Sequence, residues 1–316
     1  MKIKKALLVA LSICTVFLVS ACQSNSAQKA EPAKAKTPAA TLAKGSGSFT
    51  MPEALGATKD DMKVFYYQPA KWTPKDPIIM VFHGLKRNAD KYRDDWTKLA
   101  DKYNLLVICP EFTEKKFPGV RYYNVGNVAE VDDREDKVGK MQPQKDWVFP
   151  VLDDIIKEAR KLAGAPEAPL AIFAHSAGAQ MTHRYVLLGG ATQAQMIIPA
   201  NSGWYTMPDR NVIFPYGLKN VDLSDEALAK AFAKPVVLLL GEADTERSKV
   251  LRKTPLSDAQ GQNRLERGKK FFAEAKAKAE AMGVPFKWQL VTVSGVGHND
   301  AQMAEAAAKL LAQLKK

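Results

Sequence analysis

Cysteine is scarce in this chain of 316 residues, which contains only three. Cys14 and Cys22 lie in or beside the apolar N-terminal segment, so Cys109 is the one thiol left in the rest of the chain. A single thiol cannot form an intramolecular disulfide. Because Cys109 ends the apolar run at residues 105–108, we expect a buried, unreactive side chain there rather than a nucleophile.

Metal-ligand motifs are also missing. The chain has four histidines, and it contains no His-x-His pattern, no His-Glu-x-x-His pattern and no pair of cysteines at ligand spacing. We therefore expect no metal and no cofactor. The formal net charge is +12, but the basic residues alternate with acidic ones, as in residues 269–280, and no basic stretch carries stacking aromatics. This distribution argues against nucleic acid as a partner.

Long apolar runs are confined to the N-terminus, where residues 6–19 follow Lys2, Lys4 and Lys5. The run is too short for a stable transmembrane helix, and it predicts a signal peptide over residues 1–21. The sequence Val19-Ser20-Ala21-Cys22 resembles a bacterial lipobox. The resemblance implies lipidation at Cys22 and attachment to a membrane of the bacterial envelope, the outer membrane in a Gram-negative host. An ordinary signal peptide cleaved nearby is the alternative.

Residues 22–48 contain almost no large apolar side chain and end in Gly-Ser-Gly-Ser. This composition is typical of a flexible tether. From residue 49 to 316, short apolar runs alternate with amphipathic stretches, which predicts one α/β domain with a mostly parallel sheet flanked by helices. Strands are expected at residues 64–68, 78–82, 105–109, 170–174, 196–199, 236–240 and 288–293, and helices at 92–103, 148–162, 180–188, 264–282 and 301–314.

A candidate nucleophile follows the strand expected at residues 170–174. The sequence there is Ala174-His175-Ser176-Ala177-Gly178, and a helix comes next. A sharp turn from a strand into a helix holds a serine in strained geometry and leaves room only for small residues two positions before and after it. Ala174 and Gly178 occupy those positions. The pattern predicts a nucleophile elbow at Ser176.

A serine nucleophile needs a histidine base and an acid that orients the base. His298 follows the last predicted strand, and Asp244 ends the sequence Gly241-Glu242-Ala243-Asp244 after the strand at residues 236–240. The order Ser176, Asp244, His298 is the order of the α/β-hydrolase triad. We therefore predict these three residues as the catalytic triad, with Glu242 as the alternative acid.

Two backbone amides are candidates for an oxyanion hole. The amide of Ala177 follows the nucleophile, and the amide of Leu85 follows His83-Gly84, directly after the strand at residues 78–82. His83 is expected to hold this loop rather than to act as a second base. His175 is expected to shape the elbow, and His183 to pack on its helix.

These motifs together resemble the α/β-hydrolase superfamily, over residues 60–316, and within it the branch of secreted esterases and polyhydroxybutyrate depolymerases. The resemblance rests on Val81-Phe82-His83-Gly84, on the sequence around Ser176 and on the Gly241–Asp244 turn. It implies a serine hydrolase that cleaves carboxylic esters, with a small-molecule or polymeric ester as substrate. A serine peptidase or amidase with the same triad is one alternative, and a non-catalytic binding lipoprotein of the envelope is another. The oligomeric state is left open.

Residues 113–146 and 202–234 are too long for ordinary connections, and loops of that length often face the substrate. Trp204 and Tyr205 follow a predicted strand at what should be the catalytic edge, so they are the candidates for substrate binding. Tyr122, Tyr123 and Trp147 in the other long segment are alternatives.

Overall fold

The computed structural model describes residues 41–315. The predicted signal peptide and the predicted lipidation site Cys22 lie outside these residues. Among the helices that the structure describes, none combines the length and the hydropathy that crossing a membrane requires.

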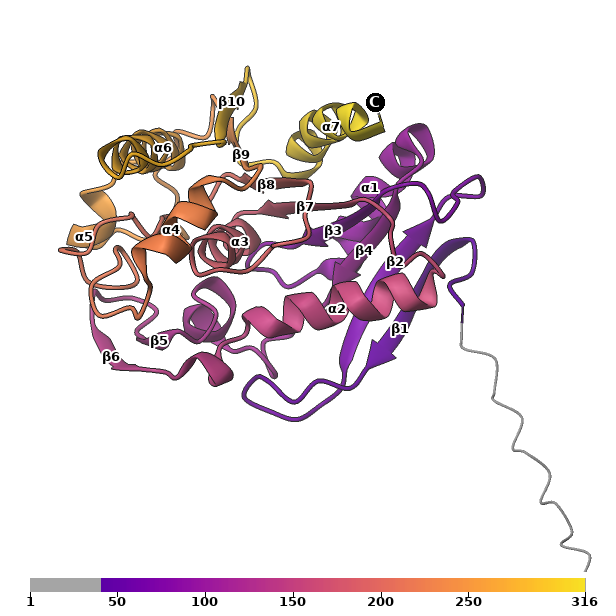
Figure 1. The fold of residues 1–316 in the computed structure, drawn as a ribbon, viewed down its shortest axis with the longest axis horizontal. Helices are drawn as coiled ribbons and strands as arrows, with labels where there is room; N and C mark the ends of the chain where they lie inside the picture. Colours follow the sequence, from indigo (N-terminus) through magenta and orange to yellow (C-terminus); the bar gives the residue numbers. More distant parts are fainter. Residues whose placement is uncertain (1–40, 316) are drawn as a thin grey trace, which may run out of the picture. The chain divides into compact units, whose positions relative to one another are not determined.

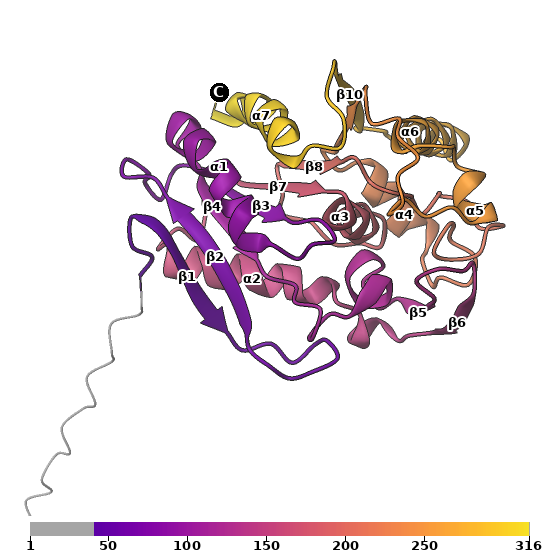
Figure 2. The same ribbon diagram turned by 180° about the vertical axis from the view of Figure 1, so that it is seen from behind.

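The sheet has eight strands in the order β1-β2-β4-β3-β7-β8-β9-β10 (Figures 1 and 2). The pairs β1–β2 and β2–β4 are antiparallel and the remaining neighbours are parallel. This arrangement confirms the predicted mostly parallel sheet. The strands are β1 (Gly45–Met51), β2 (Met62–Gln68), β3 (Ile78–Phe82), β4 (Leu106–Pro110), β7 (Leu170–His175), β8 (Met196–Ala200), β9 (Val237–Gly241) and β10 (Gln289–Val293).

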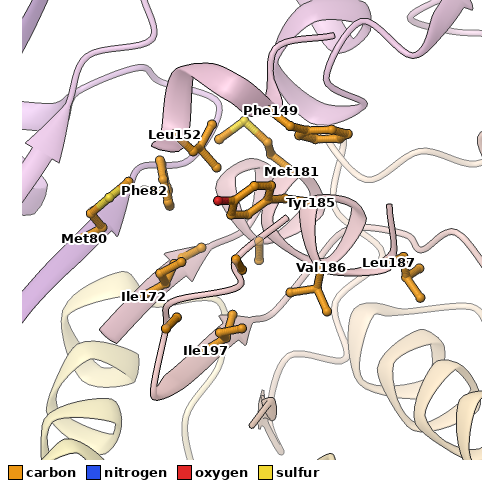
Figure 3. Close-up of a cluster of buried hydrophobic side chains, with 14 of the residues drawn as sticks. Met80, Phe82, Phe149, Leu152, Ile172, Met181, Tyr185, Val186, Leu187 and Ile197 are labelled. Atoms are coloured by element: carbon orange, nitrogen blue, oxygen red, sulfur yellow. The ribbon is translucent and has the colours of Figure 1, made fainter. Parts of the chain in front are cut away.

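Helices cover both faces of the sheet (Figure 1). On one face α1 (Ala89–Tyr103) packs beside α7 (Asp300–Leu311). The other face carries α2 (Phe149–Leu162), α3 (Ala177–Leu187), α4 (Asp225–Phe232) and α6 (Arg264–Ala281). Alternate residues of the central strands enter the two cores: Met80 and Phe82 face α2 and α3, whereas Ile79 and Val81 face α1 and α7. Figure 3 shows part of the first core, which includes Phe82, Leu152, Ile172 and Met181.

All the strands and helices expected from the sequence are present, with ends that differ by a few residues. The long segments contain elements that the sequence analysis did not predict. These are a π-helix at Val120–Asn124, the hairpin of β5 (Ala129–Val131) and β6 (Val138–Met141), a short 3-10 helix at Gln144–Asp146, and α4; the short helix α5 (Pro255–Asp258) precedes α6.

The predicted tether extends too far. Residues 45–48 belong to β1, which pairs with β2 from Gly45 opposite Gln68 to Met51 opposite Met62. Gly47 lies under the Tyr66 ring, where a Cβ atom would come within 2.4 Å of the ring and its hydroxyl. Gly47 therefore makes room for an aromatic ring, and because residues 45–48 are paired in β1, the prediction of flexibility up to residue 48 is wrong.

Candidate active site

Ser176 lies at the junction of β7 and α3 and has φ 56° and ψ −113°. A positive φ is unusual for a residue with a side chain and costs free energy, so surrounding contacts must hold it. The Ser176 amide donates to the carbonyl of Ala200 on the neighbouring strand, at 3.0 Å. The sequence pattern predicted this strained turn, and the backbone angles confirm it.

Gly178 permits the close approach of α3 to the end of β3. A Cβ atom there would come within 2.7 Å of the His83 carbonyl oxygen and 2.8 Å of the Phe82 Cβ. In the same place, the Gly178 amide donates to the His83 carbonyl at 3.1 Å. This contact brings the His83-Gly84-Leu85 turn against the nucleophile, since a Cβ atom on Gly84 would lie 3.6 Å from the Cβ of Ser176.

Ser176, His298 and Asp244 form a hydrogen-bonded line. The distance from His298 Nε2 to Ser176 Oγ is 3.0 Å, and the distance from His298 Nδ1 to an Asp244 carboxylate oxygen is 2.7 Å. Asp244 is buried, and its carboxylate can accept the Nδ1 proton, which leaves Nε2 free to accept the hydroxyl proton of Ser176. Glu242 is instead exposed, and it accepts a hydrogen bond from the Thr292 hydroxyl at 2.7 Å.

Asn201 joins the two loops that carry the predicted acid, Asp244, and the predicted base, His298, and the sequence analysis did not foresee this contact. Its side-chain oxygen accepts the Gly241 amide at 2.8 Å, and its side-chain nitrogen donates to the Gly297 carbonyl at 3.1 Å. Gly241 allows the loops to touch, since a Cβ atom there would come within 2.4 Å of the Val296 carbonyl oxygen. The sequence offers only one sign of this contact, which is that a polar residue, Asn201, directly follows the buried strand β8.

The other three histidines are buried and held as neutral rings. His83 accepts the Phe112 amide at Nε2 and lies 3.0 Å from the Gly84 carbonyl at Nδ1, and burial lowers its pKa to about 3. Burial also lowers the pKa of His175 and of His183 well below the usual value. The His175 ring packs against that of His298 at a tilt of 38°, with ring centroids 4.6 Å apart, and its Nδ1 lies 2.9 Å from the Tyr92 hydroxyl. These positions agree with structural roles.

The turn that carries Leu85 is anchored by Arg87, a second residue that the sequence analysis missed. The Arg87 guanidinium donates to the carbonyls of Phe112 and Gly119 and lies 4.2 Å from the centre of the Tyr123 ring. Tyr123, one of the proposed pocket aromatics, is fully buried and donates to the His83 carbonyl at 2.6 Å. Tyr123 therefore stabilises the His83-Gly84-Leu85 turn through this hydrogen bond.

Two cavities meet at Ser176. One has a volume of about 510 Å³ and the other about 310 Å³, and both are lined by Leu85, Ser176 and Val250. The long segments contribute to the larger cavity through Val120, Asn124, Gly203 and Trp204, among other residues. Both segments thus reach the space beside the nucleophile, as their length suggested.

The larger cavity is lined with positive charge. Its wall carries one carboxylate, Asp133, and five basic side chains: Arg134, Lys249, Arg252, Lys253 and Arg264. Lys86 and Lys91 line the smaller cavity, where Lys91 is paired with Asp300 and Asp95. Clefts lined by one sign of charge concentrate ligands of the opposite sign.

Trp204 and Tyr205 have different positions. Trp204 is on the wall of the larger cavity, and the centre of its ring lies 4.2 Å from the Arg184 guanidinium and 5.2 Å from that of Arg252. Tyr205 points away from both cavities into the core and stacks on Phe271 with ring centroids 4.5 Å apart. Tyr205 therefore lines neither cavity, and the structure gives no support to its predicted contact with substrate.

Cys109 is a free, buried thiol in β4, and burial raises its pKa well above the usual value. In the part of the chain that the structure describes, no group of three or more histidine, cysteine, aspartate or glutamate side chains is arranged to hold a metal ion.

Many solved structures are similar to this chain, and two of them share a substantial part of its sequence. Poly(aspartic acid) hydrolase-1 from Sphingomonas sp. KT-1 is 36% identical in sequence with a TM-score of 0.78, and the match covers 85% of this chain and 99% of the hydrolase. LpqC, a poly(3-hydroxybutyrate) depolymerase from Bordetella parapertussis, is 29% identical with a TM-score of 0.78, and 85% of this chain and 89% of LpqC are covered.

A more distant similarity extends to the siderophore hydrolase EstB from Aspergillus nidulans, at 12% identity and a TM-score of 0.51 over 88% of this chain and 97% of EstB. At this identity the similarity concerns the fold alone. No protein-family model and no curated protein sequence matches the chain.

Proposed function

The chain belongs to the family of α/β hydrolases that includes poly(aspartic acid) hydrolase-1 and LpqC, and from this we propose that it is a serine hydrolase that cleaves carboxylic esters through an acyl-enzyme at Ser176. The observation that carries the proposal is the hydrogen-bonded line from Ser176 through His298 to Asp244. A hydroxyl becomes an effective nucleophile when a neighbouring base accepts its proton as it attacks.

In the proposed reaction, Ser176 Oγ attacks the ester carbonyl while His298 Nε2 accepts its proton. Asp244 holds the ring in the required tautomer and stabilises the imidazolium that forms. His298 then protonates the departing alcohol, and the acyl group stays on Ser176. Water, deprotonated by His298, attacks the acyl-enzyme. The bond between Ser176 Oγ and the acyl carbon then breaks, His298 returns the proton to Oγ, and the acid is released.

The negative charge on the tetrahedral intermediate needs two donors. We assign them to the backbone amides of Leu85 and Ala177. Ala177 is the first residue of α3, where the helix provides no acceptor for the amide and its dipole favours an anion. The turn of Leu85 lies against Ser176 through Gly84, which supports its assignment.

The test is hydrolysis of a series of p-nitrophenyl esters from acetate to palmitate by the wild-type protein and by Ser176→Ala. We expect turnover in the wild type and a fall in kcat of at least about 10³-fold in the variant, since loss of the nucleophile removes the acyl-enzyme route. A phosphonate probe should label only the wild type. Labelling of a correctly folded Ser176→Ala protein would place the nucleophile elsewhere.

A second candidate function is cleavage of amide bonds in a polyanionic chain. The basic wall of the larger cavity favours it, and the 36% identical relative is by name a hydrolase of poly(aspartic acid). Ester and amide hydrolysis can share the same triad and oxyanion donors. If this candidate is correct, incubation with poly(aspartic acid) will release shorter chains and new amino groups; ester turnover with intact polymer would rule it out.

We also propose that the protein is anchored in the bacterial envelope by a lipid on Cys22. The support is the lipobox-like sequence ending at Cys22. Replacement of Cys22 by Ala should prevent incorporation of a labelled fatty acid and release the protein from the membrane fraction. Incorporation that persists in the variant would exclude Cys22 as the anchor.

A further inference from the structure

Arg264 occupies a position that links the larger cavity to the predicted triad. It is the first residue of α6, and its side chain lines the cavity that begins at Ser176. On its other side, the guanidinium contacts the Asp244 carboxylate oxygen that does not bind His298, at 3.3 Å. One cationic group therefore lies between the space for substrate and the acid of the triad.

The guanidinium is buried but poorly satisfied. Only 4% of the Arg264 side chain is exposed. Its two hydrogen bonds, to Asp244 at 3.3 Å and to Ser248 at 3.4 Å, are long compared with the 2.7–2.9 Å typical of charged pairs. Its Nε is buried and has no partner among the described residues. A guanidinium has five N–H donors, so this one retains the capacity to bind a further acceptor.

The charged residues of the cavity wall favour a negatively charged acceptor. Asp133 is the one acidic side chain on the cavity wall, and it is engaged by the Val120 amide at 2.9 Å. The other charged residues of the wall are basic, and they include Lys249 and Arg252 as well as Arg264. A neutral acceptor would leave this positive charge largely uncompensated, whereas a carboxylate neutralises it and fits the planar fork of a guanidinium.

We propose that Arg264 binds a carboxylate of the substrate, placed on the acyl or leaving-group side of the bond that Ser176 attacks, while its bond to Asp244 holds the acid in position. This inference rests on the proposed serine-hydrolase function. It makes Arg264 a specificity-determining residue for anionic substrates, and a positioning residue for the triad. The two roles affect different kinetic constants, because carboxylate binding acts on KM of anionic substrates alone and positioning of Asp244 acts on kcat of every substrate.

The experiment compares two esters of equal chain length, p-nitrophenyl hydrogen adipate, which carries a free carboxylate, and p-nitrophenyl hexanoate, which does not. For the wild type we expect a KM for the adipate ester about tenfold or more below that for the hexanoate ester. In Arg264→Gln this difference disappears, while kcat falls by the same factor for both esters. Arg264→Lys, which keeps the charge but not the fork, should recover part of the difference.

Arg210→Gln is the matched control, since it removes the same charge from an arginine that lines neither cavity and pairs with Asp225. It should retain the wild-type difference in KM. An Arg264→Gln protein that still prefers the adipate ester, or a wild type without such a preference, would overturn the inference. Failure of the wild type to hydrolyse either ester would instead count against the proposed function.

Discussion

At the scale of single residues, the geometry of the site depends on side chains that take no part in the proposed bond making. Asn201 has a positive φ of 50° and uses both ends of its amide to hold the Asp244 and His298 loops together. Asparagine tolerates this backbone conformation better than most residues, and its amide provides both a donor and an acceptor. No other type of side chain of this size meets both requirements.

We predict that Asn201→Gly lowers kcat/KM for a p-nitrophenyl ester by about 10- to 100-fold, since displacement of a catalytic group by about 1 Å has effects of this size. Glycine accepts the positive φ, so the variant isolates the loss of the two hydrogen bonds. The free energy of unfolding should fall by about 1–3 kcal/mol. Urea denaturation and steady-state kinetics provide the two measurements.

The comparison variant is Asn201→Asp, which keeps the acceptor for the Gly241 amide but loses the donor to the Gly297 carbonyl. It should retain more activity than Asn201→Gly. Equal and wild-type activity in both variants would show that the loops hold their positions without Asn201.

At the scale of elements, β1 contains a glycine, Gly47, at the position where the Tyr66 ring of the neighbouring strand leaves no room for a side chain. Its Gly-Ser-Gly-Ser sequence has the composition of a linker, yet it forms an edge strand because Tyr66 of β2 lies across Gly47. The Tyr66 hydroxyl also accepts the amide of Ala43, just before the strand. The contacts that order this strand come from its neighbour.

We therefore expect Gly47→Val to destabilise the protein by about 1–3 kcal/mol, the usual cost of inserting a side chain into a filled space. Valine has a higher strand propensity than glycine, so a tether without contacts would not be destabilised. The next residue supplies the control: Ser48 is exposed, and Ser48→Val should change the free energy of unfolding by less than about 0.5 kcal/mol. Equal effects at the two positions would contradict the role of Tyr66.

At the scale of the whole molecule, three of the four histidines are buried as neutral rings: His83, His175 and His183. In the unfolded chain each would bind a proton below about pH 6.5. The native state has the lower pKa at each site, so acidification favours the unfolded state. The stability that these rings contribute is fully present above about pH 6.5 and is lost as the pH falls towards the native pKa, which is about 3 for His83.

We predict that the free energy of unfolding decreases from pH 7 to pH 5 with a slope that approaches about 1.4 kcal/mol per pH unit for each of these histidines. Urea denaturation at several pH values measures the slope. Carboxylates contribute to acid unfolding as well, so the informative comparison is with His83→Gln, which should have a shallower slope. An identical slope in the variant would mean that His83 does not remain neutral in the folded protein.

The sequence by itself determined the order of the central strands and of the longer helices, the strained serine turn and the candidate positions of the acid and the base. These features are local: apolar periodicity marks the strands, and small residues around Ser176 mark the turn. The parallel sheet follows from them, because strands separated by helices pair in parallel and bring their carboxyl ends to one edge, where Asp244 and His298 lie.

Only the tertiary structure decided which side chains meet. His298 and Ser176 are 122 positions apart in the chain, and Asn201 reaches Gly297 across 96 positions. The ring over Gly47, the inward direction of Tyr205 and the contact of Arg264 with Asp244 likewise depend on what other segments place nearby. Local composition does not predict such contacts. The same glycine or arginine can occur in a linker, on a surface or in a buried site, and only the segments that pack against it decide which.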